Sequence, residues 1–160
     1  MHDPDVIAVQ AAIHPNPTVA RLGIGLDHQY VEWCWTPLLG PTGTVLLRRL
    51  NAFCLDSGRA SRPVPALADE LGLKPATVRR TVERLQNFGF LGRQVAGVRD
   101  LYATVAPLTS RQLDKLPATV RDAHNRFVNE LLAPAPLRTT QRLDLLERRS
   151  SGVGVHRSAE

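Results

Sequence analysis

The sequence has few cysteines and no long apolar run. Cys34 and Cys54 are the only cysteines among 160 residues, too few for a disulfide framework or a zinc site of four thiolates. We interpret both as small core residues in a reducing cytosol. No apolar run approaches the ~20 residues needed to cross a bilayer, and the start MHDPDVIAVQ has no basic stretch before an apolar one. We therefore expect a cytoplasmic protein, nucleoid-associated if it binds DNA, without signal peptide or membrane contact.

Motifs of common enzyme classes are also missing. The sequence has no G-x-x-x-x-G-K-[ST] loop, no G-x-S-x-G elbow and no H-E-x-x-H motif. Its five histidines are scattered without the spacing of metal ligands. We predict from this that the protein is not an enzyme and uses no cofactor or metal ion.

Positive charge is concentrated in one segment. Residues 74–99 carry a net +5, which equals the net charge of the whole chain. A focused positive patch indicates a polyanionic partner, although a solvated helix face is the alternative. The cations are Lys74, Arg79, Arg80, Arg84, Arg93 and Arg99, against Glu83 alone.

The first 39 residues give weak signals. Residues 1–25 mix prolines and glycines with short apolar runs, which suggests a loosely ordered arm. Val31, Trp33 and Trp35 then alternate with polar or small residues, a period of two that predicts a short strand or a packed arm. The tryptophans either anchor this segment to the core, the favoured interpretation, or stack on bases.

A first helix is predicted from Gly40-Pro41-Thr42, because proline is well placed in the first turn of a helix. Asp56-Ser57-Gly58 ends it, and a short linker, 59–63, follows. Arg48 and Arg49 fall on the outer side of this helix. Its apolar face is formed by Val45, Leu46, Leu50, Phe53 and Cys54.

Residues 64–89, VPALADELGLKPATVRRTVERLQNFG, predict two short helices. Gly72 closes the first, since glycine readily adopts the left-handed conformation of a helix end, and Pro75 opens the second. Two helices joined by such a turn form a helix-turn-helix unit. The second helix buries Val78, Val82 and Leu85.

The opposite side of the second helix is polar and cationic. Small Ala76 and Thr77 near its start would let it approach a base edge, as the N-terminal residues of a recognition helix do. After it, Phe90–Val95 and Leu101–Val105 read as two strands flanking residues 96–100. The sequence thus predicts a hairpin with a basic tip beside the recognition helix.

These motifs resemble the winged helix-turn-helix domains of bacterial transcription regulators of the GntR and MarR type. The similarity covers residues 43–105 and rests on L-A-x-x-L-G-L, T-V-R-R, R-L-x-x-x-G-F and a glycine-containing hairpin ending in L-Y. Lys74 departs from the usual serine or threonine, which removes a helix cap but adds a cation. The resemblance implies base and phosphate contacts by Lys74, Thr77, Arg79 and Arg80, and a wing at the minor groove formed around Arg93, Gly97 and Arg99.

The last periodic segment predicts a helix capped by Thr109 or Ser110 and restarting after Pro117. Its near-heptad stripe is typical of a helix that packs on another helix. We predict burial against a second subunit, with folding back on the same domain as the alternative. His124, beside the stripe, serves in packing or senses pH at an interface. The predicted dimerisation residues are Leu113, Leu116, Val120, Phe127 and Leu131.

The sequence therefore predicts an α+β, mainly α, winged helix-turn-helix protein with an N-terminal arm and a C-terminal helix. The expected parts are an arm (1–39), the DNA-binding domain (40–107), the C-terminal helix (108–133) and a disordered tail (134–160). The expected function is double-stranded DNA binding as a homodimeric bacterial transcription regulator, with no effector identified. The alternative is an interaction module of a plasmid replication, transfer or partition complex. The predicted DNA-binding residues are Lys74, Ala76, Thr77, Arg79, Arg80, Arg84, Arg93, Gly97 and Arg99.

Overall fold

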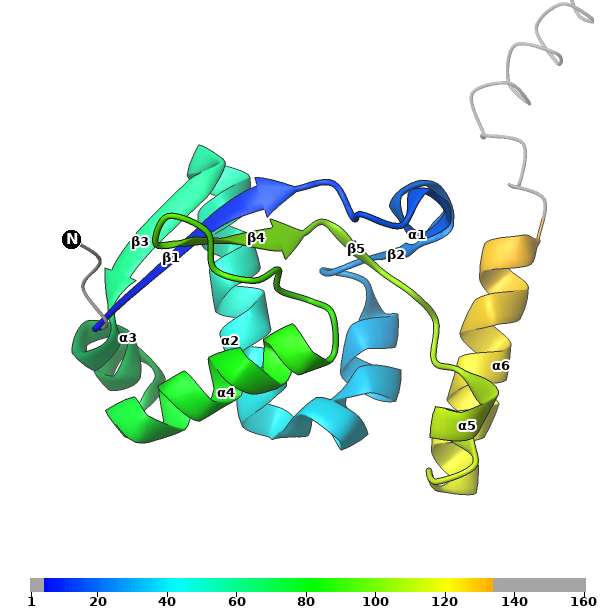
Figure 1. Ribbon diagram of the computed structural model, residues 1–160. Coiled ribbons are helices and arrows are strands. Elements are labelled where there is room, and N and C mark those ends of the chain that lie inside the picture. The colour runs from blue at the N-terminus through cyan, green and yellow to red at the C-terminus, as the bar shows by residue number, and fades with distance from the viewer. Residues whose placement is uncertain (1–4, 134–160) are drawn as a thin grey trace, which may run out of the picture. The chain divides into compact units, whose positions relative to one another are not determined.

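The computed structural model describes residues 5–133, so the predicted disordered tail lies outside the described residues. Residues up to Val128 belong to one compact unit, and 129–133 are the described part of a second. The protein is α+β and mainly helical, as predicted (Figure 1). Its elements are β1 (Val6–Ala12), α1 (Pro17–Leu22), β2 (Ile24–Gly25), the π-helix η1 (Val31–Trp35), α2 (Thr36–Ser57), β3 (Arg59–Pro63), α3 (Val64–Leu71), α4 (Pro75–Asn87), β4 (Val98–Tyr102), β5 (Thr104–Val105), α5 (Ser110–Leu113) and α6 (Ala118–Leu132).

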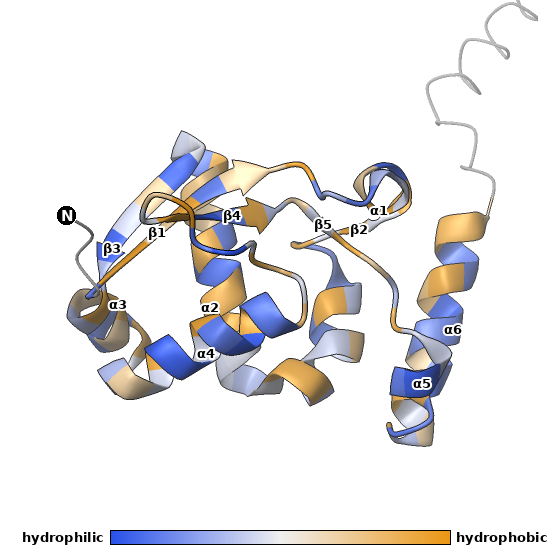
Figure 2. Ribbon diagram, viewed as in Figure 1, coloured by the Kyte–Doolittle hydropathy of each residue, from blue (hydrophilic) through white to orange (hydrophobic). Residues whose placement is uncertain are grey.

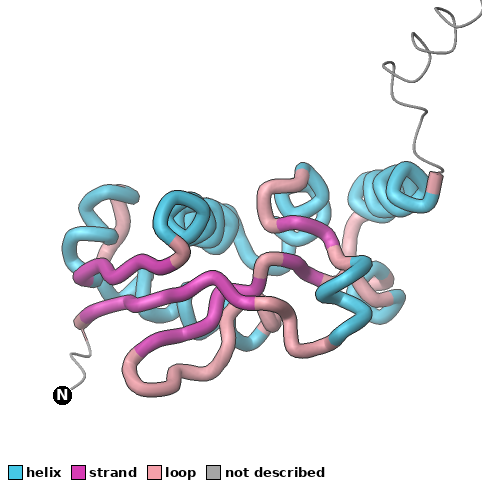
Figure 3. The backbone as a smooth tube through the Cα atoms, turned by 90° about the horizontal axis from the view of Figure 1, so that it is seen from above, coloured by secondary structure: helices cyan, strands magenta, loops and turns pink. Residues whose placement is uncertain are grey.

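The N-terminal segment is part of the fold, and the expectation of a loosely ordered arm is wrong. β1 is the central strand of a sheet ordered β3-β1-β4, antiparallel to β3 and parallel to β4 (Figure 3). Ile7 and Val9 alternate with less buried neighbours and point into the core. Residues 59–63, expected to be a linker, are the edge strand β3. β2 and β5 form a separate two-stranded sheet.

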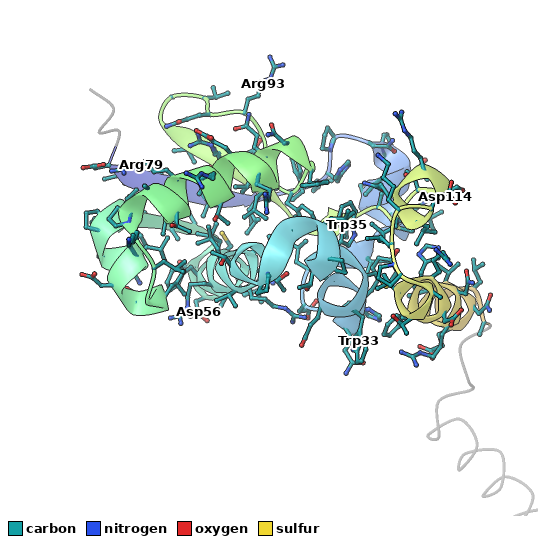
Figure 4. The ribbon with its side chains drawn as sticks, turned by 90° about the horizontal axis from the view of Figure 1, so that it is seen from below. Trp33, Trp35, Asp56, Arg79, Arg93 and Asp114 are labelled. Atoms are coloured by element: carbon teal, nitrogen blue, oxygen red, sulfur yellow. The ribbon has the colours of Figure 1, made fainter. Side chains whose placement is uncertain are left out.

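The tryptophan-bearing segment is helical, so the predicted strand over residues 31–36 is wrong. η1 leads directly into α2, which is kinked at Gly40 with φ 77°. The helix restarts at Pro41, as predicted, and ends at Gly58 with φ 73°. Trp35 is buried and anchors this segment against Phe88 and Phe90, whereas Trp33 is 58% exposed (Figure 4).

The two predicted short helices are confirmed. α3 ends at Gly72, whose φ of 65° is the left-handed conformation that glycine adopts without strain. α4 begins at Pro75 and buries Val78, Val82 and Leu85. Both helices cover the same face of the sheet as α2 (Figure 1). Most of the core therefore lies between the sheet and these three helices.

A hairpin follows α4, but the predicted strand Phe90–Val95 is not formed, since only isolated bridges join Leu91 to Leu101 and Val95 to Val98. In place of the predicted strand Leu101–Val105 the structure has β4 and β5, and the turn comes earlier than predicted. Val95 and Val98 exchange two backbone hydrogen bonds across Ala96 and Gly97. Both turn residues have positive φ, 48° and 84°, as in the tight turns that match the twist of paired strands. Arg99 consequently lies in β4 rather than at the tip of the hairpin.

The stripe of the last helix is buried within its own chain as far as Phe127. Thr109, one of the two predicted caps, begins α5 with a capping box to Gln112, and the helix restarts after Pro117 as expected. The Phe127 ring meets the rings of His28 and Tyr30 edge-on, at centroid distances of 5.6 and 6.0 Å. The alternative of folding back thus holds for these positions, because burial here needs no second subunit. Leu116 and Phe127 are buried, Leu113 and Val120 are half-buried, and Leu131 is half-exposed.

Candidate nucleic-acid interface

The outer face of α4 is polar and exposed (Figure 2). Ala76 and Arg80 are exposed on the side opposite Val78 and Val82, and Lys74 is exposed at the start of the helix. Within residues 5–133, neither the Lys74 ammonium nor the Arg80 guanidinium has a hydrogen bond or ion pair with another side chain or the backbone. These two cations are therefore available to an external anion. Lys74 is the N-cap residue of α4, but its side chain makes no capping hydrogen bond, as expected because lysine has no acceptor.

Arg79 is also exposed, but its charge is already matched. Its Nη2 forms an ion pair with Asp5 Oδ1, immediately before β1. Figure 4 shows Arg79 reaching from α4 to the N-terminal end of that strand. Thr77 is half-buried, and its carbonyl accepts a hydrogen bond from the Thr81 hydroxyl at 2.7 Å.

Arg84 is exposed, but its guanidinium also makes a contact within the protein. Its Nη1 donates to the carbonyl oxygen of Leu39 at 3.1 Å. That carbonyl precedes the kink at Gly40, where the helical hydrogen-bond ladder of α2 is interrupted. The guanidinium provides a hydrogen-bond donor for this backbone carbonyl at the kink, and the bond links α4 to α2.

The hairpin presents one cation outward and one inward. Arg93 is exposed and points away from the body of the protein (Figure 4). Arg99 is half-buried, and its Nε donates to Gln86 Oε1 of α4 at 3.5 Å. The tip itself is apolar, because Val95 is 73% exposed. The predicted basic tip is thus a basic flank formed by Arg93.

A cavity of about 280 Å³ lies between α4, the hairpin and β1. Arg79 and Arg99 line it from opposite sides, together with the carboxylate of Glu83. Gln94 also lines it, and its Nε2 donates to the Gly97 carbonyl at 3.1 Å, which steadies the turn. This junction is the place where α4 and the hairpin meet the N-terminal strand.

Sequence reasoning therefore found the surface but missed its internal partners. The structure places Ala76 and Arg80 on the outer face of α4, exposed Arg79 on its flank, Lys74 at its start and Arg93 on the neighbouring hairpin. The sequence analysis missed Asp5, because the first residues were expected to be a loosely ordered arm. The alternation of Ile7 and Val9 with small or polar residues was the signal that a strand begins there.

Both cysteines are buried in the core. Burial raises the pKa of the Cys34 thiol to about 11 and raises that of Cys54 as well. Both thiols stay protonated near neutral pH, and both are free, as interpreted from the sequence. Among residues 5–133 no group of His, Cys, Asp and Glu side chains has the arrangement of a metal site. None of the described helices is long and apolar enough to cross a membrane.

A second, larger hollow of about 620 Å³ lies along the outer side of α2 and η1. Apolar Pro41, Val45 and Ala52 line it, flanked by Arg48 and Arg49. Val45 was expected in the core but is half-exposed here.

No protein-family model matches the sequence, and no curated protein matches it. Among solved structures, the chain is similar to the crystal structure of residues 1–300 of primosome protein DnaB from Geobacillus stearothermophilus. The TM-score is 0.51 at 16% sequence identity, and the match covers 84% of this chain and 53% of that one. At this identity the similarity concerns the fold alone, and this chain spans about half the length of its structural neighbour.

Proposed function

We propose that this protein is a winged helix-turn-helix protein that binds duplex DNA. α3 and α4 are the helix-turn-helix, α4 is the recognition helix in the major groove, and the hairpin before β4 is the wing on the flanking backbone. The observation that carries the proposal is the pair of exposed, unpaired cations Lys74 and Arg80 on α4. Arg93 extends this positive surface onto the hairpin.

The dimensions and chemistry of this surface suit a major groove. A single α-helix fits that groove, and arginine makes bidentate hydrogen bonds to guanine there. Ala76, in the first turn of α4, is exposed and small, so it does not hold the helix away from base edges. Lys74 and Arg93 flank the helix, where phosphates of the two strands would lie.

Two roles are compatible with this chemistry. The first is a bacterial transcription regulator that binds a palindromic site as a dimer. Because the stripe of α6 is buried in its own chain, such a dimer would use another surface, for which half-exposed Trp33 and Val45 are apolar candidates. The second is a module of a replication, transfer or partition complex, and the fold shared with a primosome protein favours this role.

The DNA-binding proposal is tested by a salt titration with matched charge variants. The chain contains two lysines, Lys74 on α4 and exposed Lys115 beside α5. Lys74→Ala combined with Arg80→Ala should weaken binding to a labelled duplex and reduce the slope of log K against log[salt] by about two units. Lys115→Ala combined with Arg111→Ala removes the same charge elsewhere and should change the slope far less. Equal effects of the two double variants would contradict the proposal.

Sequencing of the DNA that is crosslinked to the protein in its host cells distinguishes the two roles. A regulator should give a few sites scattered over promoters, each with dyad symmetry. A replication or transfer module should instead give DNA clustered around one origin.

A further inference from the structure

Asp5 is held in place beside the recognition helix by backbone structure. Its carbonyl oxygen accepts a hydrogen bond from the Val64 N–H at 2.6 Å, which extends the β1–β3 ladder by one step beyond Val6 and Pro63. The backbone of Asp5 is therefore held at the start of β1, next to α4. From there its carboxylate reaches Arg79 in the second turn of α4.

This ion pair is exposed at the surface proposed for DNA. The side chains of Arg79 and Asp5 keep 45% and 55% of their accessible surface, so water and ions reach both. Exposed pairs of this kind are weak, and they break when a stronger competitor arrives. A DNA phosphate is such a competitor, because arginine binds phosphate with two hydrogen bonds and duplex DNA carries a high charge density.

We propose that Asp5 is an internal competitor for the DNA phosphate at Arg79, so that the N-terminal strand lowers the affinity of α4 for DNA. This inference rests on the proposed function. Before Arg79 binds a phosphate, its pair with Asp5 must open, and the released carboxylate then stays near the negatively charged backbone. Both effects weaken binding to any duplex. They do not depend on base sequence, because the proposed contact of Arg79 is with a phosphate.

The consequence is a reserve of affinity that the free protein does not use. Lys74 and Arg80 are available at once, whereas Arg79 becomes available only when Asp5 is neutralised or displaced. A partner with a basic side chain that takes over Asp5 would therefore strengthen DNA binding without touching DNA.

The test compares two isosteric changes on the same side of α4. Asp5→Asn removes the carboxylate paired with Arg79, while Glu83→Gln removes a carboxylate one turn further along α4 that lines the same cavity. Binding of the full-length protein to a random fluorescein-labelled duplex is measured by anisotropy over a series of salt concentrations. Arg79→Gln and the double variant Asp5→Asn/Arg79→Gln complete a thermodynamic cycle.

Asp5→Asn should bind about three- to tenfold more tightly than wild type near 50 mM salt, with a salt slope steeper by about one unit. Glu83→Gln should give a smaller gain from charge alone. In the Arg79→Gln background the effect of Asp5→Asn should shrink to that of Glu83→Gln. Melting temperatures should stay close to wild type, because the Asp5 carbonyl still accepts from Val64.

Two results would overturn the inference alone. One is that the wild-type protein binds DNA but Asp5→Asn and Glu83→Gln change its affinity by the same factor. The other is weaker binding by Asp5→Asn, which would mean that Asp5 orients Arg79 for DNA. Wild-type protein without salt-dependent DNA binding would instead overturn the proposed function, and this inference with it.

Discussion

At the scale of single residues, the six cations of residues 74–99 divide into two groups. Lys74, Arg80 and Arg93 are exposed without partners in the described chain, whereas the remaining three arginines are engaged within the protein. Sequence spacing shows which residues share a helix face. It does not show a carbonyl oxygen left open by a kink or a carboxylate brought in by a distant strand. That is why a charge count overestimated the free cationic surface.

Arg80 is expected to contribute to base recognition. On a cognate site, Arg80→Ala should cost about 1–3 kcal/mol and reduce discrimination among base substitutions, as loss of a bidentate base contact does. Arg93→Ala should weaken cognate and random duplexes by the same factor, since a phosphate contact carries no sequence information. Competition titrations with single-base variants of the site measure both. Unchanged discrimination in Arg80→Ala would place base recognition elsewhere.

Arg84 is expected to affect stability more than DNA binding. Arg84→Ala leaves the Leu39 carbonyl without its donor and should cost about 1–3 kcal/mol of unfolding free energy in urea titrations. Arg84→Lys restores a donor and should recover part of the loss. A variant as stable as wild type but defective in DNA binding would show that Arg84 belongs to the interface after all.

His124 is expected to make stability depend on pH. Its Nδ1 and the Tyr30 hydroxyl form a hydrogen bond of 2.6 Å, and that hydroxyl oxygen accepts from the Leu108 N–H at 2.8 Å. Burial lowers the pKa of His124 below 6.5 and raises that of Tyr30, so both are neutral at pH 7. A lowered histidine pKa contributes stability above 6.5 that is lost as the pH falls through the folded-state pKa. Melting temperatures between pH 7.5 and 5 should fall further for wild type than for His124→Gln.

At the scale of elements, the helices of residues 64–87 were predictable because local signals agree. Proline starts, glycine ends and a helical apolar period all point to the same bounds. The strand β3 was not predictable, because it has the sequence RASRP and mostly exposed side chains. Its pairing depends on β1, a partner about 50 residues away in sequence. Long-range pairing of this kind leaves little trace in a local pattern.

The last helix illustrates a different limit. A near-heptad stripe predicts that a helix packs on something, but it does not say whether the partner is another copy or the same chain. Here the aromatic rings of His28 and Tyr30 supply the surface for Phe127. Their spacing alone does not mark them as a docking site.

Phe127→Ala tests this packing. It should cost about 3–5 kcal/mol of unfolding free energy, as removal of a buried aromatic side chain does. The oligomeric state measured by light scattering should not change, because the ring is buried within its own protomer. Leu131→Ala, at a half-exposed position of the same helix, is the control and should cost much less. A shift from dimer to monomer in Phe127→Ala at constant stability would restore the stripe as a subunit interface.

At the scale of the whole molecule, β1 is the element on which the proposed interface depends. It pairs with β3 on one side and with β4 on the other, and it carries Asp5 to α4. β3 precedes the helix-turn-helix, and β4 belongs to the hairpin. The proposed recognition helix and wing are therefore held together through a strand that comes first in the sequence.

Removal of residues 1–12 should consequently abolish cooperative folding. The deletion removes both hydrogen-bonded ladders of β1. It also removes the buried side chains of Ile7 and Val9, and burial of each side chain contributes about 1.5–3 kcal/mol to the free energy of unfolding. That loss approaches the whole stability of a typical domain, about 5–15 kcal/mol. Circular dichroism melts should show no sharp transition, and DNA binding should be lost with it. Removal of residues 1–4 is the matched control, because it leaves every pairing of β1 intact.

One outcome would contradict the argument. β3 and β4 run antiparallel to each other across β1, so they have the orientation to pair directly if β1 is removed. A truncated protein that still melts cooperatively and binds DNA would show that they do so, and that β1 serves only to place Asp5 beside Arg79.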